Sequence, residues 1–144
     1  MSASPSPDRL VLDGSVTLAW LFHDEKDPYA DRIVGKLPNV IFFVPRLWHL
    51  EIGNVLLVGE RRGRCTQADI ATWLAFLGGL PIVVDGETEL GAWTDTIALA
   101  RLHGLSEYDA AYLELALREG IPIATLDAKL EAAAKAAGVP IYKA

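Results

Sequence analysis

Short apolar runs without polar alternation recur along the chain, and segments of helical period separate them. Most of these runs are rich in β-branched or aromatic residues, and Gly, Pro or Asp bounds them, which is typical of a buried strand. Continuous apolar strands of this kind belong in a parallel sheet that is covered on both faces. We therefore predict strands over residues 9–13, 40–44, 81–84 and 122–125, and a short final strand over 140–142.

Between these strands, apolar residues recur at the three- and four-residue intervals of an amphipathic helix. The pattern predicts helices over residues 47–63, 67–77, 87–103 and 127–137, and another that Ala111, Leu115 and Leu117 mark and that ends at Gly120. One face of the predicted helix 87–103 carries Leu90, Trp93, Ile97 and Arg101. Strands that alternate with helices form right-handed βαβ units, so the expected fold is a three-layer α/β/α sandwich with a mostly parallel central sheet.

The composition is that of one domain from a reducing compartment. With 144 residues, 51% of them hydrophobic, the chain buries enough surface to fold without a disulfide or a structural metal. Its single cysteine, Cys65, cannot form an internal disulfide. We expect residues 1–8, rich in Ser and Pro, to form a flexible tail and residues 9–144 to form the domain. Because the longest uncharged stretch, residues 71–84, is too short for a membrane span, we expect a cytoplasmic protein.

Acidic residues stand where strands of the predicted sheet end. Asp13 and Asp127 each follow a hydrophobic strand, and open parallel sheets bind ligands at the carboxyl ends of their strands. Glu51 lies largely on the apolar stripe of its helix, where a carboxylate is costly unless a cation or a proton compensates it. Asp109 falls in the first turn of a helix whose axis directs it toward the same edge. These four acids are the candidates for one site.

Three of these acids also have a purely local explanation. Asp13 precedes a glycine and has the setting of a turn residue. The interval from Ser106 to Asp109 is that of a capping box, and Asp127 is placed to cap the last helix. If the four carboxylates meet, however, they raise one another's pKa values unless divalent cations lie among them. Hard oxygen ligands select Mg²⁺ or Mn²⁺.

Four sequence blocks resemble the PIN-domain ribonucleases, and most closely the VapC toxins of bacterial toxin–antitoxin pairs. The resemblance runs from Val11 to about Gly138. The blocks are Val11-Leu-Asp13-Gly-Ser15-Val16 with Trp20 following, Pro45-Arg-Leu-Trp-His-Leu-Glu51-Ile-Gly-Asn54-Val-Leu56, His103-Gly-Leu-Ser106-Glu-Tyr108-Asp109-Ala-Ala-Tyr112-Leu, and Ala124-Thr125-Leu-Asp127. The first block has Asp-Gly-Ser where Asp-Ala-Ser is commoner, which keeps the acid and the hydroxyl. The last block lacks the aromatic residue that many relatives carry three positions after the acid, which bears on packing.

The resemblance implies an endoribonuclease toxin that hydrolyses RNA with metal-activated water. It implies that the four acids form a site for one or two Mg²⁺ ions, with Mn²⁺ as a substitute, and that Asp13 and Asp109 bind the metal directly. Glu51 and Asp127 would bind directly or through water. Supporting hydrogen-bonding residues would be Ser15, Asn54 and Thr125. The implied partners are an RNA substrate, a cognate antitoxin and a second copy of the chain.

The net charge of −6 excludes a protein that holds RNA by a bulk positive field, so phosphate contacts must be local. The candidates are Arg46, Arg61, Arg62 and Arg64. Arg61 and Arg62 have an alternative role, since basic residues complement the dipole at a helix C-terminus. We expect structural or solvent-facing roles for the three histidines. The four tryptophans are expected in the core or in dimer contacts; they are Trp20, Trp48, Trp73 and Trp93.

Two other functions stay open at this point. The first is a PIN-like binding or scaffold subunit that has lost catalysis, and the presence of all four acids argues against it. The second is a structure-specific DNA nuclease, which usually brings helical arches or basic segments. This short acidic chain has no room for such additions.

Overall fold

Four parallel strands form one sheet in the order β3-β2-β1-β4 in the computed structural model, which describes residues 5–144. The strands are β1 (Asp8–Leu12), β2 (Val40–Val44), β3 (Ile82–Val84) and β4 (Ile123–Ala124). Beyond β4, Ile141 adds a single parallel bridge to Ile123 where the final strand was predicted. The positions of the strands and their parallel direction are confirmed. The part of the predicted tail that falls on residues 1–4 lies outside the described residues.

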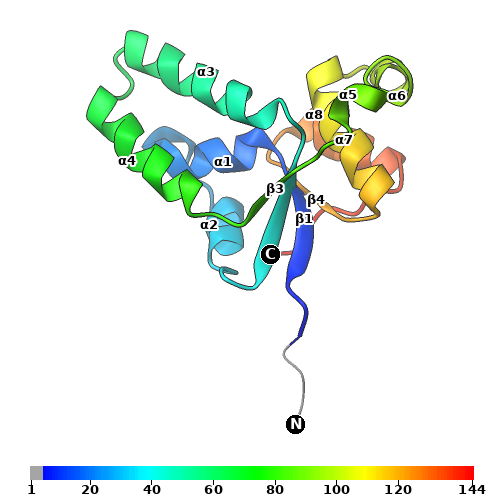
Figure 1. Cartoon of the computed structure of the whole chain (residues 1–144), viewed down its shortest axis with the longest axis horizontal. Coiled ribbons are helices and arrows are strands. Elements are labelled where there is room, and N and C mark those ends of the chain that lie inside the picture. Colours follow the sequence, from blue (N-terminus) through cyan, green and yellow to red (C-terminus); the bar gives the residue numbers. More distant parts are fainter. Residues whose placement is uncertain (1–4) are drawn as a thin grey trace.

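Helices cover the sheet on both sides, so the predicted three-layer sandwich is confirmed (Figure 1). One side holds α1 (Gly14–Leu21), α2 (Pro28–Val34), α3 (Trp48–Arg61) and α4 (Gln67–Gly78), with a 3₁₀ turn, η1 (His23–Glu25), between α1 and α2. The other side holds α5 (Thr88–Gly91), α6 (Asp95–His103), α7 (Glu107–Glu119) and α8 (Ala128–Ala136). No helix among the described residues has the length and apolar character needed to cross a bilayer.

The central strand β1 supplies fully buried residues to the core. Its residues Leu10, Val11 and Leu12 are fully buried, because β2 and β4 pair with it on either edge and helices cover its faces. Val11 stands beside Phe43 of β2 and Ile123 of β4 in the register of the sheet. Such close packing fixes the residues that follow β1 and β4, which is where the candidate site begins.

Two helices, α1 and α2, have no counterpart in the hydrophobic pattern. In α1, apolar side chains point in all directions because the helix packs against η1, α2 and α3, and a helix without a polar face shows no periodic pattern. Helix α2 carries a recognisable start, because Pro28 is its first residue and the Asp27 carboxylate accepts a hydrogen bond from the Tyr29 N–H at 2.7 Å.

The predicted single helix over residues 87–103 is wrong. The structure has the short α5 and the longer α6, separated at residues 92–94. Gly91 is a weak helix former, and the Thr94 hydroxyl donates to the Gly91 carbonyl at 3.4 Å, a local bond that competes with a continuous helix. The predicted common face is absent as well, since Leu90 is 73% exposed and Trp93 87% exposed. Trp93 is therefore not a core residue of this chain.

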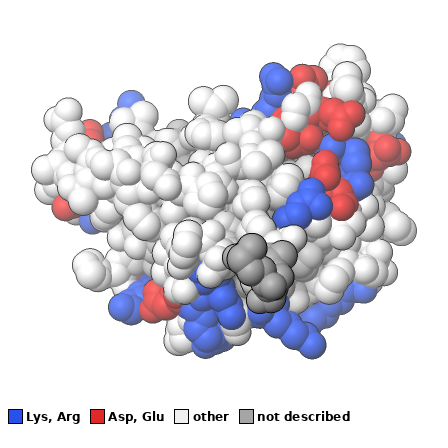
Figure 2. All heavy atoms as spheres, turned by 60° about the horizontal axis from the view of Figure 1, so that its bottom comes forward, with Lys and Arg blue, Asp and Glu red and all other residues white. Residues whose placement is uncertain are grey.

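Charged side chains are unevenly distributed over the face that Figure 2 shows, the lower end of the molecule in Figure 1. Acidic and basic side chains interleave on the side of α5–α8, whereas few charges lie over the α3–α4 side. On α7, Arg118 forms ion pairs with Asp85 and Glu114.

Candidate active site

A pocket of about 250 Å³ lies at the carboxyl ends of β1 and β4, and acidic side chains from five segments line it. The acids are Asp13, Glu25, Glu51, Asp109 and Asp127. The other lining residues are Gly14, Ser15, Leu18, Ile52 and Val55. The structure thus brings together all four acids that the sequence singles out, and it adds Glu25 to them.

Asp13 is the most buried of these acids, with 6% of its surface exposed. Its backbone N–H donates to the Ala124 carbonyl at 3.1 Å, which places it directly beyond the pairing of β1 with β4. Its Oδ2 accepts hydrogen bonds from the hydroxyls of Ser15 at 2.6 Å and Thr125 at 2.8 Å. Burial raises the pKa of Asp13 above its usual value, and the two hydroxyl bonds oppose this rise only in part.

Glu51 reaches the pocket from the first turn of α3. The Tyr112 hydroxyl of α7 donates to its Oε1 at 2.6 Å. Partial burial raises the pKa of Glu51, and the negative charges of Asp13 and Asp109 add to the rise against the effect of the Tyr112 bond. These charge effects mean that the carboxylates lie close enough to repel one another.

Asp109 and Asp127 each lie at the start of a helix. The Asp109 N–H donates to the Ser106 hydroxyl at 3.1 Å, and the Asp127 Oδ1 accepts from the Leu130 N–H at 2.9 Å. Burial raises the pKa of Asp109, followed by the charges of Asp13 and Asp127. Asp127 caps α8 as its local explanation required, whereas α7 is capped by the Ser106 hydroxyl without the return bond from the Asp109 carboxylate that completes a capping box, and both acids line the pocket. Capping and a place in the site do not exclude each other.

The chemistry of the pocket suits a hard divalent cation, although the side chains do not surround one as they stand. Within residues 5–144, no three His, Cys, Asp or Glu side chains are close enough together to hold a metal ion. The Glu51 Oε2 and the Asp127 Oδ2 accept no hydrogen bond from the described residues, so these hard oxygen atoms are free of protein donors.

Comparison with known proteins identifies the family of this fold and site. The family model described as "PIN domain" matches residues 10–136, which is most of the chain. The chain belongs to the PIN domain family. It is 30% identical over 122 residues to Ribonuclease VapC3 of Pyrobaculum aerophilum, a match that covers 85% of this chain and 92% of the relative. The crystal structure of PAE2754 from Pyrobaculum aerophilum shares the fold, with a TM-score of 0.64, 23% identity, and coverage of 88% of this chain and 79% of that one.

The hydrogen-bonding residues expected to support the PIN-domain acids differ in their placement. Ser15 and Thr125 both bond the Asp13 carboxylate, and Ser15 also accepts from the Leu126 N–H at 2.9 Å, which ties the start of α1 to the loop after β4. Asn54, in contrast, is exposed on α3, does not line the pocket and forms no side-chain hydrogen bond among the described residues. Its supporting role stays a prediction.

The four arginines expected to meet RNA lie outside the acidic pocket. Arg61 and Arg62 are exposed at the end of α3 without an ion pair among residues 5–144. Arg46 pairs with Glu89 at 3.6 Å, and Arg64 lies over the Phe22 ring. Arg64 also bonds Asp24 at 3.0 Å and Glu25 at 3.2 Å. Contact with RNA stays a prediction for all four, and Arg64 already has acidic partners.

The aromatic and imidazole side chains of the PIN domain mostly occupy the expected surroundings. Trp48 is buried, and its Nε1 donates to the Thr17 hydroxyl at 3.1 Å. Trp20 and Trp73 are partly buried and contact Phe42 and Phe22, respectively. None of the histidines lines the acidic pocket in the described part of the chain.

Sequence reasoning missed Glu25 and Tyr112 as members of the site. Glu25 lies in η1, directly after a helix that the hydrophobic pattern does not indicate, so nothing in its spacing points to the pocket. Tyr112 follows Asp109 by one helical turn, an interval that places both on the same face of α7. The interval between Asp109 and Tyr112 was therefore the sequence signal that could have placed Tyr112 beside the acidic site.

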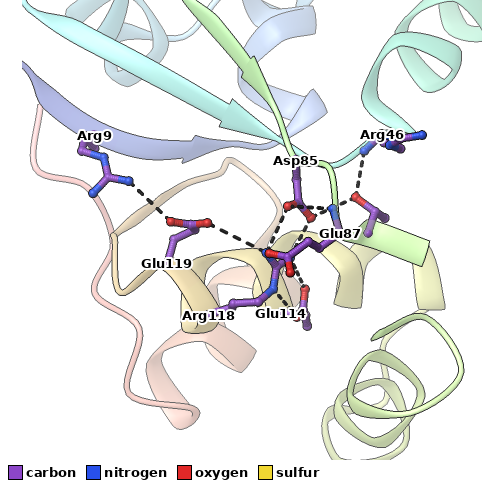
Figure 3. A network of polar contacts seen from close by, with 8 residues as sticks. Arg9, Arg46, Asp85, Glu87, Glu114, Arg118 and Glu119 are labelled. Carbon is purple, nitrogen blue, oxygen red and sulfur yellow. Dashed lines mark hydrogen bonds and ion pairs between the residues drawn. The ribbon is translucent and has the colours of Figure 1, made fainter. Parts of the chain in front are cut away.

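A second acidic group of the PIN domain lies outside the pocket and is bridged by Arg118 (Figure 3). Asp85 ends β3 as Asp13 ends β1, but Arg118 Nη2 donates to its Oδ2 at 2.6 Å. The same guanidinium bonds Glu114 at 2.8 Å and Glu87 at 3.1 Å, and Glu119 lies 3.9 Å away. Because the Arg118 guanidinium already pairs with these acids, they are poor candidates for binding a metal.

Proposed function

We propose that this PIN domain is a metal-dependent endoribonuclease and acts as the toxin of a toxin–antitoxin pair. The supporting observation is the convergence of Asp13, Glu51, Asp109 and Asp127, which lie on separate segments, on one pocket at the carboxyl edge of the sheet. The name of the similar protein, Ribonuclease VapC3, supports RNA as the substrate. Together they favour hydrolysis over a binding role.

The chain's own groups would hold and orient the reacting parts. Asp13 and Asp109 would be the direct ligands of Mg²⁺ or Mn²⁺, and Glu51 and Asp127 would bind directly or through water. The hydroxyls of Ser15 and Thr125 fix the Asp13 carboxylate, so this ligand is already oriented. A bound divalent cation would lower the pKa of a coordinated water and offset the phosphate charge, so that hydrolysis leaves a 5′-phosphate and a 3′-hydroxyl.

The acidic surface limits how RNA can approach. A net charge of −6 opposes general binding of polyanions, so we propose that the enzyme selects a particular RNA by shape and by an exposed single-stranded loop. Arg61 and Arg62 are the first candidates for phosphate contacts, since they are exposed and carry no ion pair among the described residues. Charge reversal at these positions would raise the KM for RNA more than it lowers kcat.

The proposal also includes two protein partners for this chain, an antitoxin and a second copy of the chain. A toxin of this class needs a cognate antitoxin, and the family resemblance also favours a homodimer. Large apolar side chains with high exposure support a protein partner, because isolated domains seldom leave several of them uncovered. The most exposed are Leu50, Leu90, Trp93 and Leu102. Analytical ultracentrifugation of the purified chain measures its molar mass in solution and so distinguishes a monomer from a homodimer.

Replacement of Asp13 by Asn tests the proposed reaction. The amide oxygen of Asn can still accept the Ser15 and Thr125 hydroxyls, so the melting temperature should be maintained. Cleavage of total RNA in Mg²⁺ or Mn²⁺ should fall by about 100-fold or more, because the variant lacks a charged ligand. Undiminished cleavage by Asp13→Asn would refute the assignment.

Asp31→Asn is the control for loss of a carboxylate outside the pocket, because Asp31 is exposed and among residues 5–144 its one ion pair is with Lys26 at 3.8 Å. It should retain full cleavage and the same melting temperature as the unmodified chain. If the unmodified chain cuts no RNA and neither metal changes its melting temperature, the catalytically silent scaffold is the better description.

A further inference from the structure

The hydrogen bond between Tyr112 and Glu51 joins two helices that are distant in sequence. Tyr112 lies on α7 with 1% of its surface exposed, and Glu51 lies on α3 at the rim of the acidic pocket. The hydroxyl donates to the Glu51 Oε1 at 2.6 Å, a short distance that is typical of a bond to a charged acceptor. No other side chain among the described residues bonds the Glu51 carboxylate.

The Tyr112 hydroxyl lies close to the segment that follows Asp13 as well as to Glu51. A Cβ placed on Gly14, the residue after Asp13, would be 4.0 Å from the Tyr112 oxygen. A tyrosine phenol is protonated at neutral pH, so the Tyr112 hydroxyl donates to the Glu51 carboxylate without adding negative charge to the pocket.

The Glu51 side chain needs a hydrogen-bond partner to hold its carboxylate in one position. Glu51 has three rotatable side-chain bonds, so without a partner its carboxylate would sample several rotamers. The bond to the rigid, buried phenol holds Oε1, whereas Oε2 accepts no hydrogen bond from the described residues. The phenol thus holds one oxygen of Glu51, a residue that lines the pocket, and the other oxygen has no hydrogen-bond partner among the described residues.

We propose that Tyr112 is a positioning residue that holds Glu51 so that its second carboxylate oxygen can bind the divalent cation. The inference rests on the proposed function and extends it to a residue outside the four acids. Outer partners that orient a metal ligand typically change metal affinity or activity by about 10- to 100-fold when they are removed. Tyr112→Phe removes only the hydroxyl, so it isolates this contact.

The competing explanation is that a buried tyrosine hydroxyl simply needs an acceptor. The chain offers a matched control for this explanation. The Tyr142 hydroxyl donates to the Asp8 Oδ2 at 2.7 Å, Tyr142 is 7% exposed, and neither residue lines the acidic pocket. Tyr142→Phe therefore removes the same kind of bond, from a buried phenol to a carboxylate, at a different place in the fold.

The experiment compares the unmodified chain with Tyr112→Phe and Tyr142→Phe. Mn²⁺ binding is measured from the electron paramagnetic resonance signal of the free ion, unfolding from thermal melts, and RNA cleavage as separate kcat and KM values. We expect similar melting temperatures for the two variants. Mn²⁺ affinity should fall about 10-fold in Tyr112→Phe alone, together with kcat, while the KM for RNA is unchanged.

A second pair of variants tests whether Tyr112 acts through Glu51. In a Glu51→Gln background, Tyr112→Phe should cause no further loss of Mn²⁺ affinity, because the ligand that it positions is gone. Full Mn²⁺ affinity and kcat in Tyr112→Phe, or an equal loss in Tyr142→Phe, would overturn the positioning role while the proposed function stands. Failure of the unmodified chain to bind Mn²⁺ and cut RNA would overturn both.

Discussion

Asp13 and Asp85 show how two acids in equivalent positions acquire different roles. Each follows a strand of the same sheet and each is buried, with 6% and 7% of its surface exposed. Asp13 is bonded by two neutral hydroxyls, and burial raises its pKa. Burial also acts to raise the pKa of Asp85, but the bonds from Arg118, from the Glu87 N–H and from a threonine hydroxyl lower it below its usual value. Asp13 remains available to an added cation, whereas Asp85 already has one.

At this scale, Asp85→Asn is predicted to lower the free energy of unfolding by about 3 kcal/mol at pH 7, because it leaves Arg118 with one fewer charged acceptor. The pKa of Asp85 is depressed in the folded state, so its contribution is complete above the unfolded-state pKa of about 3.9. The contribution is lost as the pH falls through the lower folded-state pKa.

Urea denaturation of both proteins between pH 7 and pH 3 measures this dependence. The difference in stability should be constant down to about pH 5 and should shrink below about pH 4. The exposed variant Asp31→Asn should show no comparable difference at any pH. A pH-independent difference, or an Asp85→Asn protein as stable as the unmodified chain, would contradict the role given to the ion pair.

The sequence was sufficient for residues whose place depends on a nearby strand or helix. Asp13 and Asp127 follow strands, and Asp109 begins a helix, so their common edge could be predicted. Glu25 and the Arg118 network could not be predicted in this way, because their neighbours come from segments whose packing no local pattern specifies.

At the level of elements, the first turn of α7 is capped by Ser106 and carries Asp109, one of the acids that line the pocket. The Ser106 hydroxyl accepts the Asp109 N–H at 3.1 Å, so Ser106→Ala should lower the free energy of unfolding by about 1 kcal/mol. The first turn of α7 would then fray, and we expect RNA cleavage to fall several-fold with the misplacement of Asp109. Denaturation and cleavage assays on the same preparation measure the two effects.

Helix α4 provides the control for this prediction. The Thr66 hydroxyl accepts the Asp69 N–H at 3.1 Å, in the same geometry, but Asp69 does not line the acidic pocket. Thr66→Ala should therefore cost about as much stability and leave cleavage unchanged. Equal activities in the two variants would show that the cap of α7 serves the helix alone.

The elements that the sequence could not predict share a physical cause. Helix α1 is surrounded by other elements and has no polar face, so the periodic signal is missing. The break between α5 and α6 depends on Gly91 and on a bond made by Thr94, which outweigh the apolar spacing of residues 87–103. Strands were easier to locate, since a sheet buried on both faces requires continuous apolar runs.

At the scale of the whole molecule, the order of the strands creates the pocket. β1 lies between β2 and β4, so the residues after β1 and β4 are neighbours although they are far apart in sequence. Helix α3 follows β2 and α7 precedes β4, and each brings one further acid to the same edge. The fold therefore assembles a group of acids whose mutual repulsion raises the pKa values of Glu51 and Asp109 in addition to the effect of burial, and bound cations would relieve that repulsion.

The most direct test of this account is diffraction from crystals grown with Mn²⁺, with data collected to reveal its anomalous signal. The account predicts a peak inside the pocket, with Asp13 and Asp109 oxygens at about 2.1 Å. It also predicts that the peak is absent in Asp13→Asn crystals grown in the same way. A saturated crystal with no peak in this pocket, or with its peak among Asp85, Glu87 and Glu114, would contradict the central claim.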